Sequence, residues 1–317
     1  MNSSEFKESI KKATNPLKGC IPSIKTYKLS VKQRYNGLSI LDFYCKAMPH
    51  ISKEIWKEKI ESGILTIEGK PVKIDRIVKT GEKTSHYTKP QTEPNINTNI
   101  ELIEWNNDFI VINKPAPLPI HPGGRFEHNS LIEILKIAFR EENFKLVHRI
   151  DANTTGLVVI ARNSITANEI IEQFKKQSVK KEYLVLVEGV LSKKSFTLEE
   201  MISKKRTPAG GRKVSKDGKK ASTHITILKR YPKKNQTLLS VVPHSGRTNQ
   251  IRIHLANAGY PIVGDIGYKK SDYFKNNPLT YEEDCLFLHA WKLTFHINNE
   301  NLLFMAPVPA KFKAYIH

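Results

Sequence analysis

Cysteine is scarce in this sequence, which contains three among 317 residues. Cys20, Cys45 and Cys285 are an odd number, lie far apart and include no Cys-x-x-Cys pair. This pattern predicts neither a disulfide framework nor a zinc site, and it is typical of a reducing compartment. We therefore expect no structural metal.

Long apolar runs are also missing. No run approaches the roughly 20 residues that a membrane-spanning helix needs. The first twelve residues are polar and rich in lysine, with no apolar centre of the kind that a signal peptide requires. We expect a soluble, cytoplasmic protein that does not associate with membranes.

Acidic residues are outnumbered: 51 Lys and Arg stand against 31 Asp and Glu, a formal net charge of +20. Such an excess favours a polyanionic partner, with nucleic acid as the leading candidate and mere solubility as the weaker alternative. Two glycines, Gly123 and Gly124, suggest a phosphate loop, but no Gly-Lys-Ser/Thr follows them, so we expect neither an NTPase nor a nucleotide cofactor.

The pattern of apolar residues divides the chain into segments. Residues 1–37 show no clear periodicity and are predicted to be an irregular lead-in. Residues 38–88 read as two short helices, the second capped by Ser52, and a small β-hairpin around a Glu68-Gly69 turn. Residues 89–99 read as a linker. Residues 100–317 alternate strand-like and helical patterns and are long enough for a larger domain.

The centre of the larger domain is the stretch from Leu146 to Arg162, where two apolar runs flank a polar segment. This pattern predicts strand, loop and strand, with Asp151 at the turn. A carboxylate on a loop between rigid strands is well placed for catalysis. An aspartate that caps its own loop is an equally good interpretation on this stretch alone.

His148-Arg149-Ile150-Asp151 and Thr154-Thr155-Gly156-Leu157 together resemble the active-site motif of the RluA-type pseudouridine synthases, in which Leu and Ser replace Ile150 and Thr155. Three further segments resemble motifs of that family in the same order: the Asn-Lys-Pro…His-Pro segment at 113–122, Lys-x-Tyr at 181–183 and Gly-Arg-Thr-Asn-Gln-Ile-Arg at 246–252. The likeness covers about residues 100–306. Pro117, Ala152 and Asn249 depart from the family pattern, which has Gly, Arg and His there.

The resemblance implies a fold and roles for individual residues. The fold is a mixed, largely antiparallel α/β sheet domain with flanking helices. Asp151 is the essential carboxylate, acting as nucleophile or as base at a ribose carbon, Tyr183 lies against the uracil, and Arg247 keeps Asp151 ionised. No cofactor is implied, because the reaction changes no oxidation state and brings in no group. Residues expected to support the site are Lys114, His121, His148, Thr155, Gly156, Thr248 and Gln250.

Several basic residues are candidates for RNA contacts. Residues 38–87 resemble the S4-like RNA-binding domain, although an unrelated αβ unit is the alternative. In the family, the arginine at position 149 occupies the space vacated by a flipped uridine. The segment 201–220 holds eight Lys or Arg and reads as a basic loop or hairpin, with a solvated surface loop as the alternative. The expected RNA-binding residues are Lys53, Lys57, Lys59, Arg149, Lys204, Lys205, Arg206 and Arg252.

These observations predict a monomeric RNA pseudouridine synthase that acts on structured RNA, with ribosomal RNA favoured and transfer RNA as a further candidate. A catalytically inactive RNA-binding or ribosome-assembly protein of the same fold is the alternative, and Asn249 and Ala152 lend it support. A nucleoside-cleaving hydrolase is a third interpretation, which predicts released uracil rather than an isomerised nucleotide.

Overall fold

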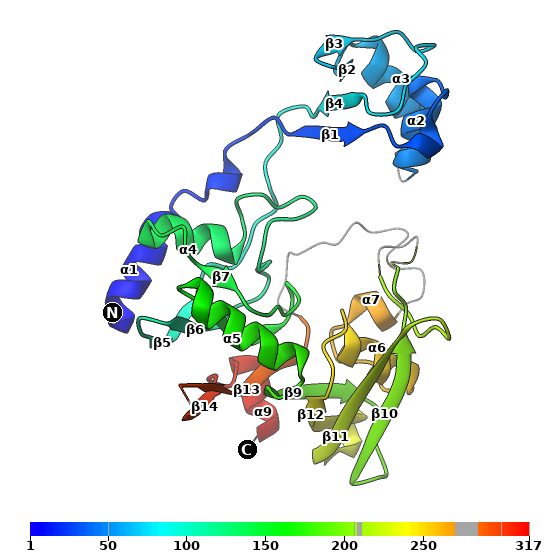
Figure 1. Cartoon of the computed structure of the whole chain (residues 1–317). Helices are drawn as coiled ribbons and strands as arrows, with labels where there is room; N and C mark the ends of the chain where they lie inside the picture. Colours follow the sequence, from blue (N-terminus) through cyan, green and yellow to red (C-terminus); the bar gives the residue numbers. More distant parts are fainter. Residues whose placement is uncertain (50, 206, 208–210, 270–284, 299, 317) are drawn as a thin grey trace. The chain divides into compact units, whose positions relative to one another are not determined.

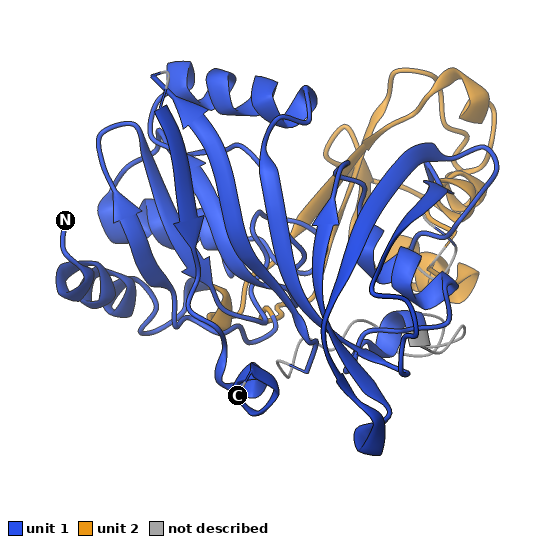
Figure 2. Cartoon of the chain, turned by 90° about the horizontal axis from the view of Figure 1, so that it is seen from below, with its two compact units in different colours: residues 1–18, 94–317 blue, residues 19–93 orange. Residues whose placement is uncertain are grey.

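The computed structural model describes residues 1–49, 51–205, 207, 211–269, 285–298 and 300–316. The chain forms two compact units, which Figure 2 shows in different colours. Unit 1 comprises residues 1–18 and 94–317, and unit 2 comprises residues 19–93. These divisions fall elsewhere than the predicted boundaries after residues 37, 88 and 99.

The prediction of an irregular lead-in over residues 1–37 is wrong. Helix α1 (Ser3–Ala13) begins at a capping box, in which the Asn2 side chain accepts from the Glu5 backbone and the Glu5 side chain accepts from the Asn2 backbone. Its residues Phe6 and Ile10 are buried in the core of unit 1. Farther on, β1 (Thr26–Ser30) pairs with a strand of unit 2.

The described residues of unit 2 form two α-helices and an antiparallel sheet, whose strand order is β1-β4-β2-β3. The Ser52 side chain caps α3 by accepting from the Ile55 backbone N–H, as predicted. The predicted turn at Glu68-Gly69 joins β2 to β3, with both residues at positive φ as a tight hairpin requires. The elements are α2 (Ile40–Ala47), α3 (Lys53–Glu61), β2 (Leu65–Ile67), β3 (Lys70–Pro71) and β4 (Lys83–Tyr87).

Unit 1 is built on one mixed sheet, which runs β10-β11-β12-β9-β13-β8-β6-β5 over the described residues, with β14 beside β13 and β7 beside β8 (Figure 1). Only the β13–β8 pair among these is parallel. The structure therefore confirms the largely antiparallel α/β fold class. The strands are β5 (Glu101–Trp105), β6 (Phe109–Lys114), β7 (Lys145–Leu146), β8 (Thr155–Ala161), β9 (Lys180–Glu188), β10 (Ser195–Ile202), β11 (Lys219–Tyr231), β12 (Gln236–Pro243), β13 (Leu288–Ile297) and β14 (Glu300–Met305).

Helices cover both faces of this sheet, because successive side chains of each strand point to opposite faces and, on strands such as β6, both sets are apolar. On β6, Ile110 and Ile112 face the core that includes α1 and α4 (Leu131–Phe139), whereas Phe109 and Val111 face the core that includes α5 (Ser164–Lys175). Helix α6 (Gln250–Asn257) packs on β9, β11 and β12. The short helices α7 (Ile266–Lys269) and α9 (Ala310–Ile316) follow. No helix within the described residues has the length and apolarity to cross a membrane.

One row of residues across the sheet positions the site. Ala290 on β13 pairs with Gly156 on β8 and with Tyr183 on β9. Gly156 has φ +112°, and a Cβ there would lie 2.2 Å from the Ala290 carbonyl oxygen, so the close approach requires glycine. The row brings the loop before β8, which carries Asp151, close to the strand that carries Tyr183.

Candidate active site

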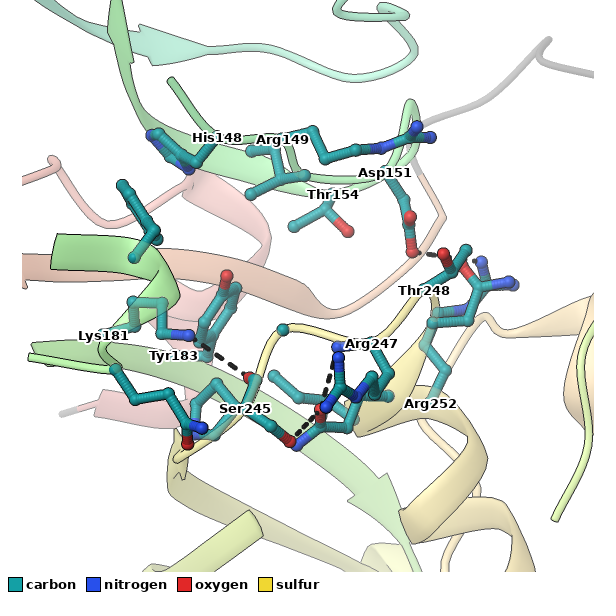
Figure 3. A pocket seen from close by; sticks show the side chains of 18 of the residues that line it. His148, Arg149, Asp151, Thr154, Lys181, Tyr183, Ser245, Arg247, Thr248 and Arg252 are labelled. Atoms are coloured by element: carbon teal, nitrogen blue, oxygen red, sulfur yellow. Dashed lines mark hydrogen bonds and ion pairs between the residues drawn. The ribbon is translucent and has the colours of Figure 1, made fainter. Parts of the chain in front are cut away.

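A cavity of about 570 Å³ opens in unit 1 where the β7–β8 loop, the end of α5, β9 and the start of α6 meet (Figure 3). Its polar lining includes eight of the eighteen residues that the sequence singled out. These are His148, Arg149, Asp151, Tyr183, Arg247, Thr248, Gln250 and Arg252. The structure therefore gathers residues that are up to about a hundred positions apart in the sequence.

Asp151 lies at one side of the cavity with a quarter of its side chain exposed. Asn249 faces it, and only one orientation of the Asn249 amide pairs donors with acceptors. In that orientation its nitrogen donates to both carboxylate oxygens of Asp151, at 2.7 and 3.1 Å, and its oxygen accepts from the Tyr268 hydroxyl at 2.8 Å. The departure from the family's His thus leaves a hydrogen bond to Asp151 in place.

The cation beside Asp151 is Arg252, whose Nη1 lies 3.6 Å from the carboxylate. Asp265 holds the other edge of this guanidinium through two hydrogen bonds of 2.7 and 2.8 Å, and the Tyr268 ring lies 4.8 Å from its centre. Burial alone would lower the pKa of Arg252, but the hydrogen bonds and charge of Asp265, with the charge of Asp151, outweigh it and raise that pKa. Arg252 is therefore a fixed, permanent cation.

The expectation that Arg247 pairs with Asp151 is wrong. Arg247 lines the cavity, but its Nε donates to the Lys220 carbonyl, and among the described residues the ion pair with Asp151 comes from Arg252. Arg247 precedes α6, so helical periodicity does not direct its side chain. Arg252 lies in the first turn of α6, three residues after Asn249, and shares the face of the helix that meets Asp151. In the structure the Arg252 side chain lies between Asp151 and Asp265, and its contact with RNA stays a prediction.

Tyr183 projects from β9 into the cavity. Burial raises the pKa of its hydroxyl, and the charge of Asp151 raises it further. The side chain is therefore a neutral phenol at physiological pH. It offers an aromatic surface for a base and a hydroxyl donor, but it is a poor proton acceptor.

Lys114 and Gln250, two of the expected supporting residues, form hydrogen bonds mainly with backbone atoms of the neighbouring loops. Lys114 is fully buried and donates to the carbonyls of Pro115, Leu118 and Ala152, which ties down the loop next to Asp151. Gln250 accepts from the Ser245 hydroxyl and from the Arg247 backbone and so fixes the segment before α6.

Two further expected supporting residues, His148 and Thr155, make their contacts through a histidine ring. The ring of His148 stacks on Phe174, and its Nε2 accepts from the Val159 backbone, so His148 supports β8. Burial, and to a lesser extent the charge of Lys181, lower the pKa of His148 to about 3. Thr155 contacts His289 through its hydroxyl, 2.9 Å from Nδ1.

Not every expected residue reaches the cavity. His121 is absent from the described lining, although burial and the charge of Arg149 lower its pKa. Thr248 and Arg149 do line the cavity, where both side chains are exposed at the edge. Lys204 and Lys205 are exposed in the connection between β10 and β11, which pair antiparallel, and their contact with RNA stays a prediction. Arg206 lies outside the described residues.

The lysines expected to bind RNA in unit 2 differ in their surroundings. Lys53 is exposed, and Lys57 is exposed beside Glu61 at 3.8 Å. Lys59 is half-buried and donates to the Tyr87 carbonyl, and burial lowers its pKa. Lys53 and Lys57 are therefore more available to a phosphate than Lys59 is.

Sequence reasoning missed Asp265 and Tyr268, which orient Arg252 and Asn249. Both lie beyond the motif segment 246–252, and their contacts with it depend on tertiary structure. As for a metal, Asp151 is the only carboxylate and His148 the only imidazole among the described residues that line the cavity, and both have protein partners. This lining does not offer a set of three metal ligands.

Comparison with known proteins identifies the family. The family model described as RNA pseudouridylate synthase matches residues 108–257. The chain is 31% identical over 275 residues to an uncharacterised RNA pseudouridine synthase of Synechocystis sp., which covers 85% of this chain and 94% of that protein. It is 32% identical over 309 residues to ribosomal large subunit pseudouridine synthase C of Buchnera aphidicola, covering 92% of this chain and 96% of that protein. The chain belongs to the RluA-type RNA pseudouridine synthases.

Members of this family are isomerases that convert uridine to pseudouridine in RNA, and this chain is such an enzyme. A more distant relative is the mitochondrial tRNA pseudouridine(32) synthase of Saccharomyces cerevisiae, 26% identical over 268 residues, which cover 83% of this chain and 57% of that protein. Among solved structures, human RNA pseudouridylate synthase domain containing 1 aligns with a TM-score of 0.54 and 24% identity, over 70% of this chain and 87% of that one. This last likeness supports the fold.

Proposed function

We propose that this pseudouridine synthase isomerises specific uridines in structured RNA, with Asp151 as its catalytic carboxylate. The observation that carries the proposal is the environment of Asp151: a carboxylate on a cavity wall, ion-paired with Arg252 and hydrogen-bonded by Asn249. In the reaction the bond between ribose and uracil N1 breaks, the base turns, and C5 of the ring bonds to the ribose instead. A fixed anion beside the ribose is suited either to attack or to take a proton there.

Ribosomal RNA is the favoured substrate and transfer RNA the second candidate. The relative named for the large ribosomal subunit aligns over nearly its whole length, whereas the relative named for transfer RNA aligns over 57% of its own length and at lower identity. The excess of positive charge suits either RNA. We place the enzyme in the cytoplasm, as a monomer.

A paired uridine has to leave its helix to reach the cavity, because Asp151 is only about a quarter exposed. Base flipping costs a few kcal/mol and needs a protein group to fill the gap. Arg149, exposed at the cavity edge, is our candidate for that group. We further propose that unit 2 is an S4-like RNA-binding domain, in which Lys53 and Lys57 contact phosphates.

The alternative of an RNA-binding protein without activity rests on Ala152 and Asn249. Asn249 still donates to Asp151, and Ala152 contributes its backbone carbonyl to Lys114, a contact that any residue makes. Neither departure removes a group that the proposed chemistry requires.

The test is chemical mapping of pseudouridine in ribosomal and transfer RNA from cells that lack the gene, after treatment with wild-type or Asp151→Ala protein. We expect wild type to restore one or a few defined positions and Asp151→Ala to restore none. Equal modification by both proteins would remove Asp151 from the mechanism. No modification of any RNA by wild type would favour the binding protein, and released uracil would favour a hydrolase.

A further inference from the structure

Lys181 is a partly buried amine in the cavity wall that the proposed chemistry of Asp151 does not use. It lies two residues before Tyr183 on β9, so both side chains project from the same face of the strand. The residue between them, Glu182, faces the other side, where it contacts Ser240 and Lys292. Among the described residues, no carboxylate pairs with Lys181.

The nearest partners of the Lys181 amine are a backbone carbonyl and an aromatic ring. Its Nζ donates to the Ser245 carbonyl at 3.2 Å and lies 6.0 Å from the centre of the Phe174 ring, on which His148 stacks. Burial lowers the pKa of Lys181 to about 8. A large fraction of the amine is therefore neutral at slightly alkaline pH, as a general base requires.

The two sides of the cavity differ in character. Figure 3 shows Lys181 and Tyr183 together on one side, and Asp151 with Arg252 on the other. If Asp151 acts at the ribose, the uracil ring extends toward Tyr183 and Lys181. The reaction needs a base at that ring, because the proton on C5 has to leave after C5 has bonded to the ribose. Tyr183, as a neutral phenol, is poorly suited to take it.

We propose that Lys181 is the base that removes the C5 proton of the uracil ring. This inference rests on the proposed function and adds a second catalytic residue to it. The neutral Nζ takes the proton from C5, and the electron pair of the C5–H bond forms the C5=C6 double bond. The electrons of the N1=C6 bond move onto N1, which has lost its ribose, and N1 takes a proton from the resulting ammonium. The proton is transferred from C5 to N1, and no co-reactant is consumed.

Other charged or titratable groups surround Lys181 and have to be considered in a pH profile. They are His148, Arg149 and Asp151 on the β7–β8 loop, Lys175 on α5, Tyr183 on β9, and Arg247 and Arg252 in the segment 243–252. Of those with a shifted pKa, the one whose value lies between pH 7 and 9 is Lys181. We expect the single-turnover rate of wild type to rise with pH and level off above about 8, since the neutral amine is the active form.

The deciding variants are Lys181→Arg and Lys181→Met, with Lys180→Met as the matched control. Lys180 is the exposed neighbour on the same strand, so its replacement removes one charge without touching the cavity. Arginine keeps the positive charge but cannot act as a base. We expect both Lys181 variants to lose roughly 10²–10⁴-fold in single-turnover rate at saturating enzyme, the typical contribution of a general base, and to lose the rise with pH. The control should match wild type.

The readout that a structural role would not affect is the isotope effect with RNA deuterated at C5 of the target uridine. If proton removal becomes rate-limiting in Lys181→Met, a primary isotope effect appears there, and small primary amines added to Lys181→Ala restore part of the rate. Lys181→Arg at the wild-type rate would overturn the proposal and assign the ammonium an electrostatic role. An isotope effect that appears in Tyr183→Phe but not in Lys181→Met would overturn it in favour of Tyr183. Absence of pseudouridine with wild type would instead contradict the proposed function itself.

Discussion

Asp151 and Arg252 form an ion pair of 3.6 Å at one side of the cavity, and they come from a loop and a helix about a hundred residues apart. Arg252 is not free to move toward the substrate, because Asp265 binds its other edge in a bidentate pair. The arrangement holds a cation at a fixed position beside the proposed catalytic carboxylate.

Arg252→Lys tests this arrangement while it keeps the charge. Lysine cannot reproduce the bidentate contact with Asp265, and a hydrogen bond to a charged group contributes about 1.5–3 kcal/mol. We expect the single-turnover rate to fall by about 10- to 150-fold. Arg230→Lys is the matched control, since Arg230 donates to backbone carbonyls of Leu191 to Lys193 outside the cavity. Equal rates for the two variants would contradict a role of Arg252 in the reaction.

Asn249→Leu removes the two hydrogen bonds to Asp151 and replaces the amide with a side chain of similar size. We expect a slower reaction with unchanged RNA affinity, measured by single-turnover kinetics and by binding. Tyr268→Phe should act through the same amide, because the Tyr268 hydroxyl donates to the Asn249 oxygen. A double-mutant cycle should therefore give a coupling energy of about 0.5–3 kcal/mol, whereas additive effects would show that the two residues act separately.

Gly156→Ala tests the close approach of β8 to β13. The added Cβ would meet the Ala290 backbone at 2.2 Å and would also sit at φ +112°. Overpacking and backbone strain each cost about 1–3 kcal/mol, so we expect a loss of at least about 2 kcal/mol in the free energy of unfolding, measured by urea titration. Gly123→Ala should be nearly neutral, because nothing lies within 4 Å of its Cβ position. Equal stability of the two variants would contradict the packing described.

Stability should fall as the pH drops below about 6.5, in part because of His289. This side chain is fully buried, and burial, with the charge of Lys311, lowers its pKa to about 3. The unfolded chain then takes up the proton first, so acid favours unfolding, by about 1.36 kcal/mol per pH unit for this one group. His289→Gln should show a shallower slope between pH 4.5 and 6.5. An unchanged slope would mean that His289 is not the neutral buried group proposed.

Salt should weaken the binding of RNA steeply. If six to ten phosphates are neutralised by the protein, the affinity falls by roughly 10³–10⁵ between 50 and 200 mM salt. Fluorescence anisotropy with a ribosomal RNA fragment gives the slope directly. A flat response would argue against RNA as the partner that the net charge of +20 indicates.

Local sequence patterns predicted much of the fold, because helix caps and tight turns depend on residues that are close together in the sequence. Ser52 marked the start of α3, and the Glu68-Gly69 pair marked a hairpin. The helix α1 was missed although Asn2 and Glu5 form a recognisable capping box, because only Phe6 and Ile10 mark its buried face. Its burial depends on partners in β5 and α4, about a hundred residues away or more.

The sequence predicted which residues line the site, but not which of them contact one another. Asp151, Tyr183 and the segment 246–252 all line the cavity, yet the arginine beside Asp151 is the second of that segment rather than the first. The choice depends on where α6 begins, which is at Gln250 directly after Asn249. The contacts of Asp265 with Arg252 likewise follow from tertiary structure that no local pattern encodes.

The most direct test of the central claim is tritium release from RNA labelled at C5 of uridine, since C5 loses its hydrogen only when it bonds to the ribose. The measurement compares wild type with Asp151→Asn, which keeps the shape of the side chain, at enzyme concentrations where both are shown to bind the RNA. We predict release by wild type, in proportion to the pseudouridine formed, and none by Asp151→Asn. Release at the same rate from both proteins would contradict the assignment of Asp151 as the catalytic carboxylate.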